Sequence, residues 1–480
     1  MREQNIGDWT IGRHLAALHA AAPESIDRLS WSREQIDAHQ EAAMRRLLAH
    51  AVVHSGFHAR RLGGVDIDGW RLADLAALPI MTKNEMMGAF DSVLTDPSVT
   101  KERADDHLAA HGRSLAYLDG RYLVITSGGS SGERGVFVWG VEAFTAYALS
   151  TVRRTMAKLA SFGITRDNPV SGALVAAGSP MHATAIIGQL IGGPAAAVNM
   201  SAIPATLPFE EIVHRLDDLQ PLFLVGYPSV LVRLADARRS GRLSIAPVAV
   251  SATSEPLPTP MRRSIEEAFG VQVTNTFGSS EGLCGVSESG SDAICFAEDT
   301  CIVELVDADN RPVAPGEFAD KVLVTNLVNH VQPLIRYELT DRFQQVAGEW
   351  PDGHLRATVE GRNDEPLRWD NAEVHPLVMR SALLHHPEVL EYQVHQTSTG
   401  ITLHVVATDQ LDTAATAAGM RDALRSAGLD HATVEVLRVD SIERNPATGK
   451  VRRFIPLDDV PAPVPSGATR TACSPLIASD

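Results

Sequence analysis

Residues 126 to 135 decide how the rest of this chain is interpreted, and they read Thr126-Ser127-Gly128-Gly129-Ser130-Ser131-Gly132-Glu133-Arg134-Gly135. Short apolar runs rich in β-branched and aromatic residues flank them, Tyr122 to Ile125 before and Val136 to Trp139 after. This pattern predicts a strand, a flexible loop and a second strand. The glycines leave the backbone free to adopt positive φ, so successive N–H groups can turn inward as an anion-binding nest. With the added hydroxyls of Thr126, Ser130 and Ser131, the loop suits a triphosphate.

Three other interpretations of this loop compete with a triphosphate site. A Walker A loop requires Lys and then Ser or Thr after its last glycine, with a helix behind it, whereas Glu133 and Arg134 follow Gly132 here. Residues 128 to 132 also satisfy G-x-S-x-G, but that nucleophile elbow turns directly into a helix, and here a strand is expected. The third interpretation is a polar hairpin loop without chemistry.

Composition limits the class of protein. A chain of 480 residues has room for two to three domains, and its 44 % hydrophobic and 21 % charged residues are typical of a soluble globular protein. The net charge of −17 argues against a nucleic-acid partner. No apolar run is long enough for a transmembrane helix, and the N-terminus has no signal-peptide core. We therefore expect no membrane partner and a cytoplasmic location.

The cysteines are Cys284, Cys295, Cys301 and Cys473, and none of them forms a C-x-x-C pair. This spacing disfavours a disulfide framework and a structural zinc site. The first three lie close together in the sequence, so a loose metal site stays open as an alternative to buried free thiols, the commoner state.

The chain before the C-terminal region combines a helical start with an alternating pattern. Residues 1 to 100 read mainly as helix, and Ser32 with Gln35 predicts a capping box for an amphipathic helix over Glu34 to His54. From residue 141 onward, helical and strand-like segments alternate, which implies a parallel, layered α/β sheet. The expected helices span 142–159, 183–190, 209–219, 228–239 and 261–269, and the expected strands 172–177, 222–226, 248–251 and 271–277.

Ligands of such sheets gather beyond the carboxyl ends of the strands, and three of these ends carry candidate residues. The first holds His182, for which packing and a pocket-lining role are the alternatives. The second is Ser254-Glu255-Pro256. The third runs from Asn275 to Glu281, where one carboxylate at a glycine-flexed strand end would suffice for phosphate-bound Mg²⁺. A solvated turn carrying one acid is the alternative for this third segment.

The C-terminal part of the sequence changes its pattern. Residues 300 to 360 look antiparallel, with strands at 301–306 and 321–325. Beyond residue 364 the order is helix, strand, strand, helix, strand, which predicts a small α+β domain. The expected elements of that domain span 376–384, 389–395, 401–407, 420–427 and 434–439. The last residues, 461 to 480, are rich in Pro, Ser, Ala and Thr, which predicts a disordered tail.

Motifs in a fixed order resemble the adenylate-forming (acyl/aryl-CoA synthetase) superfamily, in its phenylacetate–CoA ligase-like branch. The glycine loop is similar to the family signature Ser-Ser-Gly-Thr-Thr-Gly-Lys-Pro: Gly129 to Gly132 agree, whereas Glu133 and Arg134 replace Lys-Pro. Ser254–Pro256 resembles the segment that packs against adenine, and 275–281 the aromatic-Gly-x-(Ser/Thr)-Glu motif. Further matches are Pro-Leu-Ile-Arg-Tyr-x-x-x-Asp at 333–341, Gly-Arg-x-Asp at 361–364 and a Gly-Lys loop ending at residue 450.

The resemblance implies a role for each matched residue. Lys450 and Arg336 would be catalytic, with a structural role as the alternative for Arg336. Glu281 would hold Mg²⁺, Asp364 would be the hinge, and His182 with Tyr227 would line the acid pocket. The residues implied in ATP and AMP binding are Thr126, Ser127, Gly128, Gly129, Ser130, Ser131, Gly132, Ser254, Glu255, Pro256, Asn275, Phe277, Gly278, Ser280, Asp341 and Arg362.

The fold and function follow from the same resemblance. We expect an α/β fold with a large N-terminal AMP-binding domain (1–361, mostly parallel sheets), a small C-terminal α+β lid domain (364–460) and the tail. The enzyme would use ATP and Mg²⁺ to activate a carboxylic acid, aryl or arylacetic, as an acyl-adenylate, and coenzyme A to form the thioester. Transfer to an amine or a carrier-protein thiol is the nearest alternative. A serine hydrolase using Ser130 and a silent nucleotide-binding homologue are further ones, and the resemblance is compatible with a homodimer.

Overall fold

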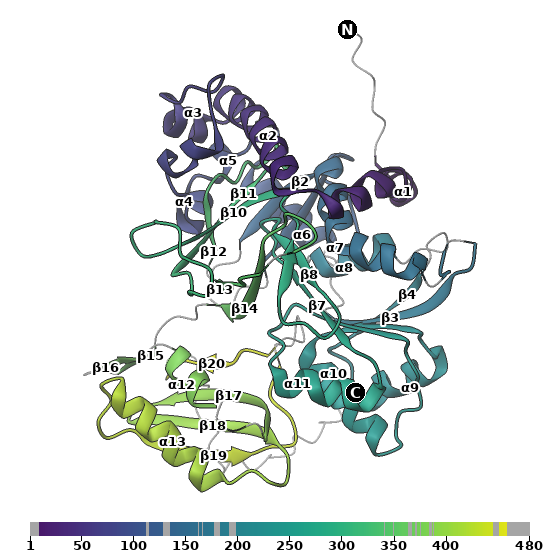
Figure 1. The fold of residues 1–480 in the computed structure, drawn as a ribbon, viewed down its shortest axis with the longest axis vertical. Helices are drawn as coiled ribbons and strands as arrows, with labels where there is room; N and C mark the ends of the chain where they lie inside the picture. The colour runs from purple at the N-terminus through teal and green to yellow at the C-terminus, as the bar shows by residue number, and fades with distance from the viewer. Residues whose placement is uncertain are drawn as a thin grey trace, which may run out of the picture.

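The computed structural model describes residues 9–111, 115–127, 135–161, 163–165, 167–176, 183–191, 198–339, 341–348, 350–362, 367–369, 372–374, 376–383, 386, 388–444 and 451–457. Figure 1 shows a larger N-terminal part above a smaller C-terminal part, which carries α12 and α13. Within the described residues, no helix is both long and apolar enough to cross a membrane.

The chain begins with helices, alternates strands and helices from β2 to β7, and continues with strands up to β16. The helices are α1 (Ile11–Asp27), α2 (Arg33–His54), α3 (Gly56–Leu62), α4 (Lys83–Gly88), α5 (Phe90–Val93), α6 (Lys101–His111), α7 (Val141–Ser161), α8 (Ala183–Ile191), α9 (Phe209–Leu219), α10 (Pro228–Arg239), α11 (Thr259–Phe269), α12 (Pro376–Leu383) and α13 (Thr413–Ser426). Short 3₁₀ turns are η1 (Arg28–Ser30) and η2 (Leu72–Ala77).

The first strands of the chain are β1 (Tyr122–Thr126), β2 (Val136–Gly140), β3 (Val170–Ala176), β4 (Val198–Pro204), β5 (Phe223–Gly226), β6 (Ala249–Thr253), β7 (Val273–Gly278), β8 (Cys284–Ser287), β9 (Ile294–Phe296) and β10 (Cys301–Val306). The later strands are β11 (Lys321–Asn326), β12 (Tyr337–Leu339), β13 (Asp341–Gln345), β14 (Arg356–Arg362), β15 (Leu367–Trp369), β16 (Ala372–Val374), β17 (Val389–Thr397), β18 (Gly400–Ala407), β19 (Thr433–Arg438) and β20 (Phe454–Ile455).

The glycine loop is held between two paired strands, as the sequence predicts. β1 and β2 are antiparallel, with Thr126 opposite Val136. The base of the loop is closed by hydrogen bonds from the Ser127 N–H to the Gly135 carbonyl (2.9 Å) and from the Gly135 N–H to the Ser127 hydroxyl (3.0 Å). Helix α7 begins only after β2. The first element described after the loop is thus a strand, whereas in a nucleophile elbow a helix directly follows the serine.

The largest sheet in the described part of the chain has the order β13-β14-β9-β8-β7-β6-β5-β3-β4. Its strands from β7 to β4 are parallel neighbours, whereas β7, β8, β9, β14 and β13 pair antiparallel. Helices α9, α10 and α11 share one hydrophobic cluster with the parallel strands, and α7 and α8 belong to a second one. The predicted layered α/β fold is confirmed.

Local sequence signals position several helices where they were expected. The capping box at the start of α2 is present, with the Ser32 hydroxyl accepting the Gln35 N–H and the Gln35 side chain accepting the Ser32 N–H. Helix α10 begins with Pro228 at its first turn, where a missing N–H costs nothing. Helix α11 ends at Gly270, whose φ of 72° suits glycine.

The smaller C-terminal domain has the predicted α+β architecture. Its sheet has the order β19-β18-β17-β20, with β17 and β18 antiparallel and the outer strands parallel to their neighbours. Helices α12 and α13 contribute Met379 and Met420 to a hydrophobic cluster with Val394 and Leu403 of the sheet. In Figure 1 this domain lies below the larger one, on the side of α10 and α11.

Several elements differ from the expectation, and two of them have a local explanation. Strand β4 was not predicted, because as an edge strand it pairs only with β3 and alternates few apolar residues along Val198 to Pro204. Its terminal proline suits such an edge. Helix α13 begins at Thr413 rather than residue 420, because Asp412 caps it by accepting the N–H groups of Ala414 and Ala415.

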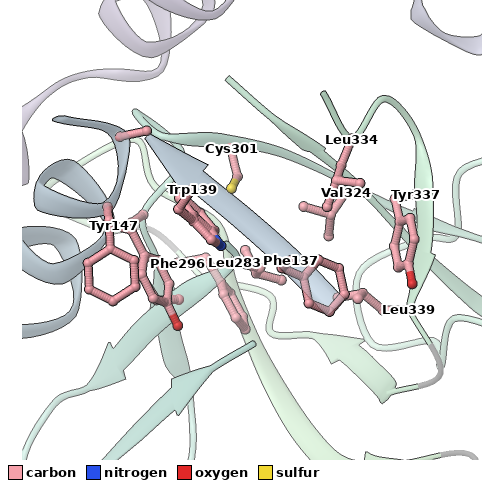
Figure 2. Packing of buried hydrophobic residues seen from close by; sticks show 14 of the residues in the cluster. Phe137, Trp139, Tyr147, Leu283, Phe296, Cys301, Val324, Leu334, Tyr337 and Leu339 are labelled. Carbon is pink, nitrogen blue, oxygen red and sulfur yellow. The ribbon is translucent and has the colours of Figure 1, made fainter. Parts of the chain in front are cut away.

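The core behind β2 includes a buried ion pair. Figure 2 shows Trp139 and Tyr147 within the apolar cluster that fills this region. Nearby, the Arg153 guanidinium of α7 makes two parallel hydrogen bonds to Asp299, at 2.6 and 2.7 Å, and both side chains are 2 % exposed. Burial raises the pKa of Asp299, but the hydrogen bonds from Arg153 outweigh it and lower that pKa below its ordinary value. The carboxylate therefore stays charged and dependent on Arg153.

Removing one partner of this pair is expected to destabilise the large domain. Arg153→Met keeps the length of the side chain but leaves Asp299 buried without its cation, at a cost of about 3–5 kcal/mol. The measurement is urea denaturation followed by tryptophan fluorescence. Arg215→Met is the matched control, because its pair with Glu211 is exposed and such pairs contribute about 0–1 kcal/mol. Equal effects of the two substitutions would contradict the assignment.

Candidate active site

The predicted site segments follow neighbouring parallel strands. Tyr227 comes directly after β5, Ser254-Glu255-Pro256 after β6, and Ser279-Ser280-Glu281 after β7. Because β5, β6 and β7 are parallel and adjacent, their carboxyl ends meet at one edge of the sheet. Polar groups from separate parts of the sequence are thus brought to the same place.

A contact joins this edge to the glycine loop. The Ser280 hydroxyl donates to the carbonyl of Thr126, the last residue of β1, at 3.4 Å. Thr126 and Ser127 are buried at the point where the glycine loop begins. The start of the phosphate-binding candidate and the segment proposed for adenine and magnesium are therefore in contact in the folded chain. Residues 128 to 132 of the loop lie outside the described residues.

Buried side chains hold the turn from Ser279 to Gly282, and sequence reasoning missed them. The Tyr147 hydroxyl of α7 donates to the Ser279 carbonyl at 2.9 Å. The Asn326 amide at the end of β11 donates to the Glu281 carbonyl at 2.9 Å. The Cys301 thiol at the start of β10 donates to the Gly282 carbonyl at 3.3 Å. Three carbonyls of the turn are thereby fixed to the core.

The two titratable donors to the turn, Tyr147 and Cys301, keep their protons. Burial raises the pKa of Tyr147 well above its ordinary value, and the nearby Cys284 and Glu281 act in the same direction. Burial likewise raises the pKa of the Cys301 thiol well above its usual range. Figure 2 shows Tyr147 and Cys301 in the same apolar cluster as Trp139. Both groups therefore remain hydrogen-bond donors at physiological pH.

Gly282 is required by the geometry of the turn. Its φ is 110°, a region that residues with a side chain rarely adopt. A Cβ at this position would lie 2.2 Å from the Asn326 amide nitrogen and 2.8 Å from the Trp139 ring. The glycine after Glu281 thus permits the close approach that fixes the carbonyl of Glu281.

The residues expected around the adenine ring differ in their exposure and in their contacts with neighbouring elements. Phe277 is partly exposed and contacts Phe296 and Phe343 edge-on, with ring centroids 5.8 and 5.4 Å away. The Asn275 N–H donates to the Ser287 hydroxyl at 2.9 Å. Ser254 has a φ of 65°, and its hydroxyl lies 3.2 Å from that of Thr184 in α8. The roles of Phe277, Asn275, Gly278, Ser254 and Pro256 toward a nucleotide stay predictions.

The oxygen atoms available as metal ligands near the glycine loop suit magnesium. Glu281 is half-buried and follows Ser280, whose hydroxyl contacts the start of the loop, directly in the sequence. Hard oxygen donors of this kind suit Mg²⁺, which keeps several waters and takes few protein ligands when it arrives with a phosphate. The cysteines Cys284, Cys295 and Cys301 are buried. In the described ranges, no group of three or more His, Cys, Asp or Glu is arranged to hold a metal ion.

Asp341 and Arg362 occupy paired positions on two strands. Asp341 begins β13 and lies opposite Arg362, the last residue of β14. The pairing places Asp341, the candidate for ribose binding, next to Arg362, the candidate for nucleotide binding, although the two residues are 21 positions apart in the sequence.

Asp364, His182 and Lys450 lie outside the described residues, so the hinge, pocket and catalytic roles assigned to them stay predictions. Tyr227 is fully buried in the second core cluster.

Arg336, for which a catalytic and a structural role are the alternatives, is held by several contacts in the described structure. Its guanidinium makes two hydrogen bonds to Glu304, both at 2.9 Å, and donates to the carbonyls of Ala76 and Leu78. Arg336 is 3 % exposed and has a φ of 49°. Burial raises the pKa of Glu304, and Arg336 opposes that rise. Of the two alternatives for Arg336, these contacts support the structural one, because its donors tie β10 to η2.

The flanks of the Lys450 loop reach the large domain. Arg444 and Val451, which bracket residues 445–450, form an isolated antiparallel bridge. The Val451 N–H donates to Glu255 at 3.2 Å, and Arg444 donates to the Ser229 hydroxyl at 2.5 Å. Both partners belong to the strand-end region of the large domain. The base of the loop that carries Lys450 is therefore anchored there.

Known proteins resemble this chain in sequence. No family model matches the sequence. A phenylacetate–coenzyme A ligase of Thermus thermophilus is 26 % identical over 380 residues, which cover 75 % of this chain and 78 % of that protein. A phenylacetate–coenzyme A ligase of Pseudomonas putida is 26 % identical over 200 residues, which cover 39 % of this chain and 44 % of that protein.

Solved structures give the same result for the fold. A 2-hydroxyisobutyryl-CoA ligase in the postadenylation state has a TM-score of 0.65 at 18 % identity, covering 88 % of this chain and 89 % of its own. The same ligase in the thioesterification state has a TM-score of 0.52 at 20 % identity, covering the same shares. The chain therefore has the fold of this coenzyme A ligase. Its sequence is similar to those of phenylacetate–coenzyme A ligases, in agreement with the resemblance inferred from the motifs.

The anchored turn leads to a prediction about nucleotide binding. Asn326→Asp keeps the oxygen that accepts the Val328 and Asn329 N–H groups but replaces the donor to the Glu281 carbonyl with a second acceptor. We expect the Kd for ATP with Mg²⁺ to rise about 10- to 100-fold, since a buried carbonyl left unsatisfied costs about 1–3 kcal/mol. Calorimetric titration measures the change.

A matched control is available for this substitution. The amide of Asn168 also donates to a backbone carbonyl, that of Gly163 at 3.3 Å, but on the exposed surface. Asn168→Asp should leave the Kd unchanged. Wild-type affinity in Asn326→Asp, with circular dichroism showing a folded protein, would mean that the turn does not form part of the nucleotide site.

Proposed function

We propose that this protein is an AMP-forming acid–thiol ligase, which activates a carboxylic acid with ATP and transfers the acyl group to coenzyme A. The observation that carries the proposal is the junction of the glycine loop with the Glu281 turn through Ser280 and Thr126. It stands at the carboxyl edge of a parallel sheet in a homologue of phenylacetate–coenzyme A ligases. The ligase that shares the fold was solved with an acyl-adenylate and with coenzyme A.

The proposed chemistry has two steps. A carboxylate oxygen of the acid attacks the α-phosphorus of ATP, and pyrophosphate leaves. The sulfur of coenzyme A then attacks the acyl carbon, and AMP leaves with the electron pair of the broken C–O bond. Neither step requires a covalent bond to the protein, so the protein acts by positioning and by stabilising charge.

Each candidate residue has a place in the first step. The backbone N–H groups of residues 128 to 132 and the hydroxyls beside them would bind the phosphates. Mg²⁺ held by Glu281 would neutralise phosphate charge. Asp341 would accept hydrogen bonds from both ribose hydroxyls, since one carboxylate offers two oxygens. Lys450 would bring a compact ammonium between the attacking carboxylate and the α-phosphate.

The position of the small domain relative to the large one supports a conformation close to that used for adenylation. The fold overlaps more fully with the postadenylation state of the solved ligase than with its thioesterification state, at TM-scores of 0.65 and 0.52. The anchored base of the Lys450 loop agrees with that difference. We propose a large domain over 1–361 and a small one over 364–460, which rotates about Asp364 between the two steps.

The acid is proposed to be aryl or arylacetic, because the relatives from Thermus thermophilus and Pseudomonas putida are phenylacetate–coenzyme A ligases. The first experiment is pyrophosphate release with ATP, Mg²⁺ and a panel of aryl, arylacetic and fatty acids, with and without coenzyme A. Release with one acid and stoichiometric consumption of coenzyme A would establish the ligase. Release without thioester would point to an amine or a carrier-protein thiol as the acceptor. ATP binding without release would favour a silent homologue and contradict the proposal.

Lys450 is the residue whose removal should affect adenylation most strongly. Lys450→Ala is expected to lower the rate of pyrophosphate release by about 10²–10³-fold, as loss of one transition-state donor does elsewhere. The KM for ATP should change much less, because the ammonium acts mainly on charge that develops during the reaction. Lys158→Ala is the control, since Lys158 lies on the exposed part of α7 and bonds Ser289. Unchanged pyrophosphate release in Lys450→Ala would remove its catalytic role.

A further inference from the structure

The carboxylate of Glu255 connects the two domains through its two oxygens. Oε2 accepts the backbone N–H of Ser229 at the first turn of α10, at 3.2 Å. Oε1 accepts the N–H of Val451, the residue directly after Lys450, also at 3.2 Å. The Glu255 side chain is 5 % exposed. Water therefore competes little with these bonds, and each oxygen has a defined partner.

Arg444 completes the contact from the small domain. One nitrogen of its guanidinium donates to the Ser229 hydroxyl at 2.5 Å and lies 4.0 Å from the nearer oxygen of Glu255. The other donates to Glu391 of β17 at 3.2 Å. Arg444 is 12 % exposed and Glu391 only 3 %. We refer to Glu255, Ser229, Arg444, Val451 and Glu391 as the domain clamp.

The clamp lies on the boundary between the hydrophobic cores. Leu390, next to Glu391, packs against the cluster formed by α9, α10, α11 and the parallel strands. Figure 1 shows α10 and α11 on the side of the large domain that faces the small one. Glu255 itself stands between Ser254 and Pro256, in the segment proposed to contact adenine. One short segment thus touches both the nucleotide site and the base of the Lys450 loop.

We propose that Glu255 is a positioning residue for adenylation, which anchors the base of the loop that carries Lys450 to the large domain. The inference rests on the proposed function. Chemistry favours a carboxylate here, because it can accept the Ser229 and Val451 N–H groups together, whereas an amide offers one acceptor oxygen. The negative charge also balances Arg444. Displacing a catalytic group by about 1 Å can lower the rate about 100-fold. A fixed position of Val451 at the base of the loop would therefore help to keep Lys450 in place.

The clamp should respond to pH through Glu391. Burial raises the pKa of Glu391 to about 7; Arg444, Arg453 and Arg233 oppose that rise, whereas Glu255 adds to it. Separation of the domains would expose Glu391 and return its pKa toward the ordinary 4.5. The closed arrangement then binds this proton more tightly, so it is favoured at low pH and weakens as the pH rises from 4.5 through 7. Glu391→Gln should remove that dependence.

The first test separates the two half-reactions. Glu255→Gln is expected to lower the kcat of pyrophosphate release with phenylacetate about 10- to 100-fold. Its rate of thioester formation from synthetic phenylacetyl-adenylate and coenzyme A should stay within about twofold of wild type, because a general folding defect would lower both. Ser229→Ala removes only the acceptor for Arg444 and should act in the same direction, more weakly. Glu210→Gln is the control, because its pair with Arg242 is exposed.

The second test needs no substrate. Spin labels at Val248→Cys and Asp409→Cys, both exposed, report the distance between the domains in a Cys473→Ser background. The remaining cysteines are buried and should not be labelled. Wild type is expected to give one narrow distance distribution, and Glu255→Gln a broader or displaced one. Measurement between pH 5 and pH 8, with Glu391→Gln alongside, tests the predicted response to pH.

The outcomes separate the clamp from the proposed function. If wild type releases no pyrophosphate with any acid, the proposed function fails, and the distance distributions alone decide whether Glu255 holds the domains. If wild type is active and Glu255→Gln matches it in pyrophosphate release, the positioning role is overturned. Equal losses in both half-reactions would also overturn it, because Glu255 would then serve general stability.

Discussion

The arrangement of the site depends on carbonyl groups that point into the core. Ser279, Glu281 and Gly282 present their backbone oxygens to Tyr147, Asn326 and Cys301, which are buried and cannot exchange these bonds for water. A buried carbonyl without a partner is costly, so the turn and its donors must form together. Because the donors come from α7, β10 and β11, packing of the core directly sets the position of Glu281. The same packing places β2, and through the β1–β2 pair the base of the glycine loop.

The two domains are joined in a different way. Their contact places two buried carboxylates, Glu255 and Glu391, around one arginine, Arg444. Such a cluster is less favourable than an apolar interface of the same size, because desolvation of charges offsets much of their attraction. The strength of this charged cluster depends on its charges and its geometry, so a small change in either can break the contact between the domains. An interface that must hold during one step and open before the next benefits from this property.

How far the sequence determined these features depends on the range of the interactions. Helix α2 was predictable because Ser32 and Gln35 are three residues apart, and α10 because Pro228 marks its first turn. The strand-end motifs could be identified because glycines and acids stand next to each other in the chain. The donors to the turn could not, since Tyr147 and Asn326 carry no local signal and meet the turn only in the folded protein. Arg336 shows the same limit: its motif was visible, whereas its partner Glu304 lies 32 positions away.

The distribution of basic residues follows from the same physical distinction. The chain has only five lysines among 42 basic residues, and arginines form its buried bidentate pairs: Arg153 with Asp299, Arg336 with Glu304 and Arg356 with Asp352. A planar guanidinium suits a permanent junction because it fixes both distance and orientation. An ammonium is compact, and its three donors rotate freely, so it can follow charge that moves between a carboxylate and a phosphate. In the proposed mechanism, Lys450 would combine such an adaptable charge with the anchor that Glu255 gives to the neighbouring Val451.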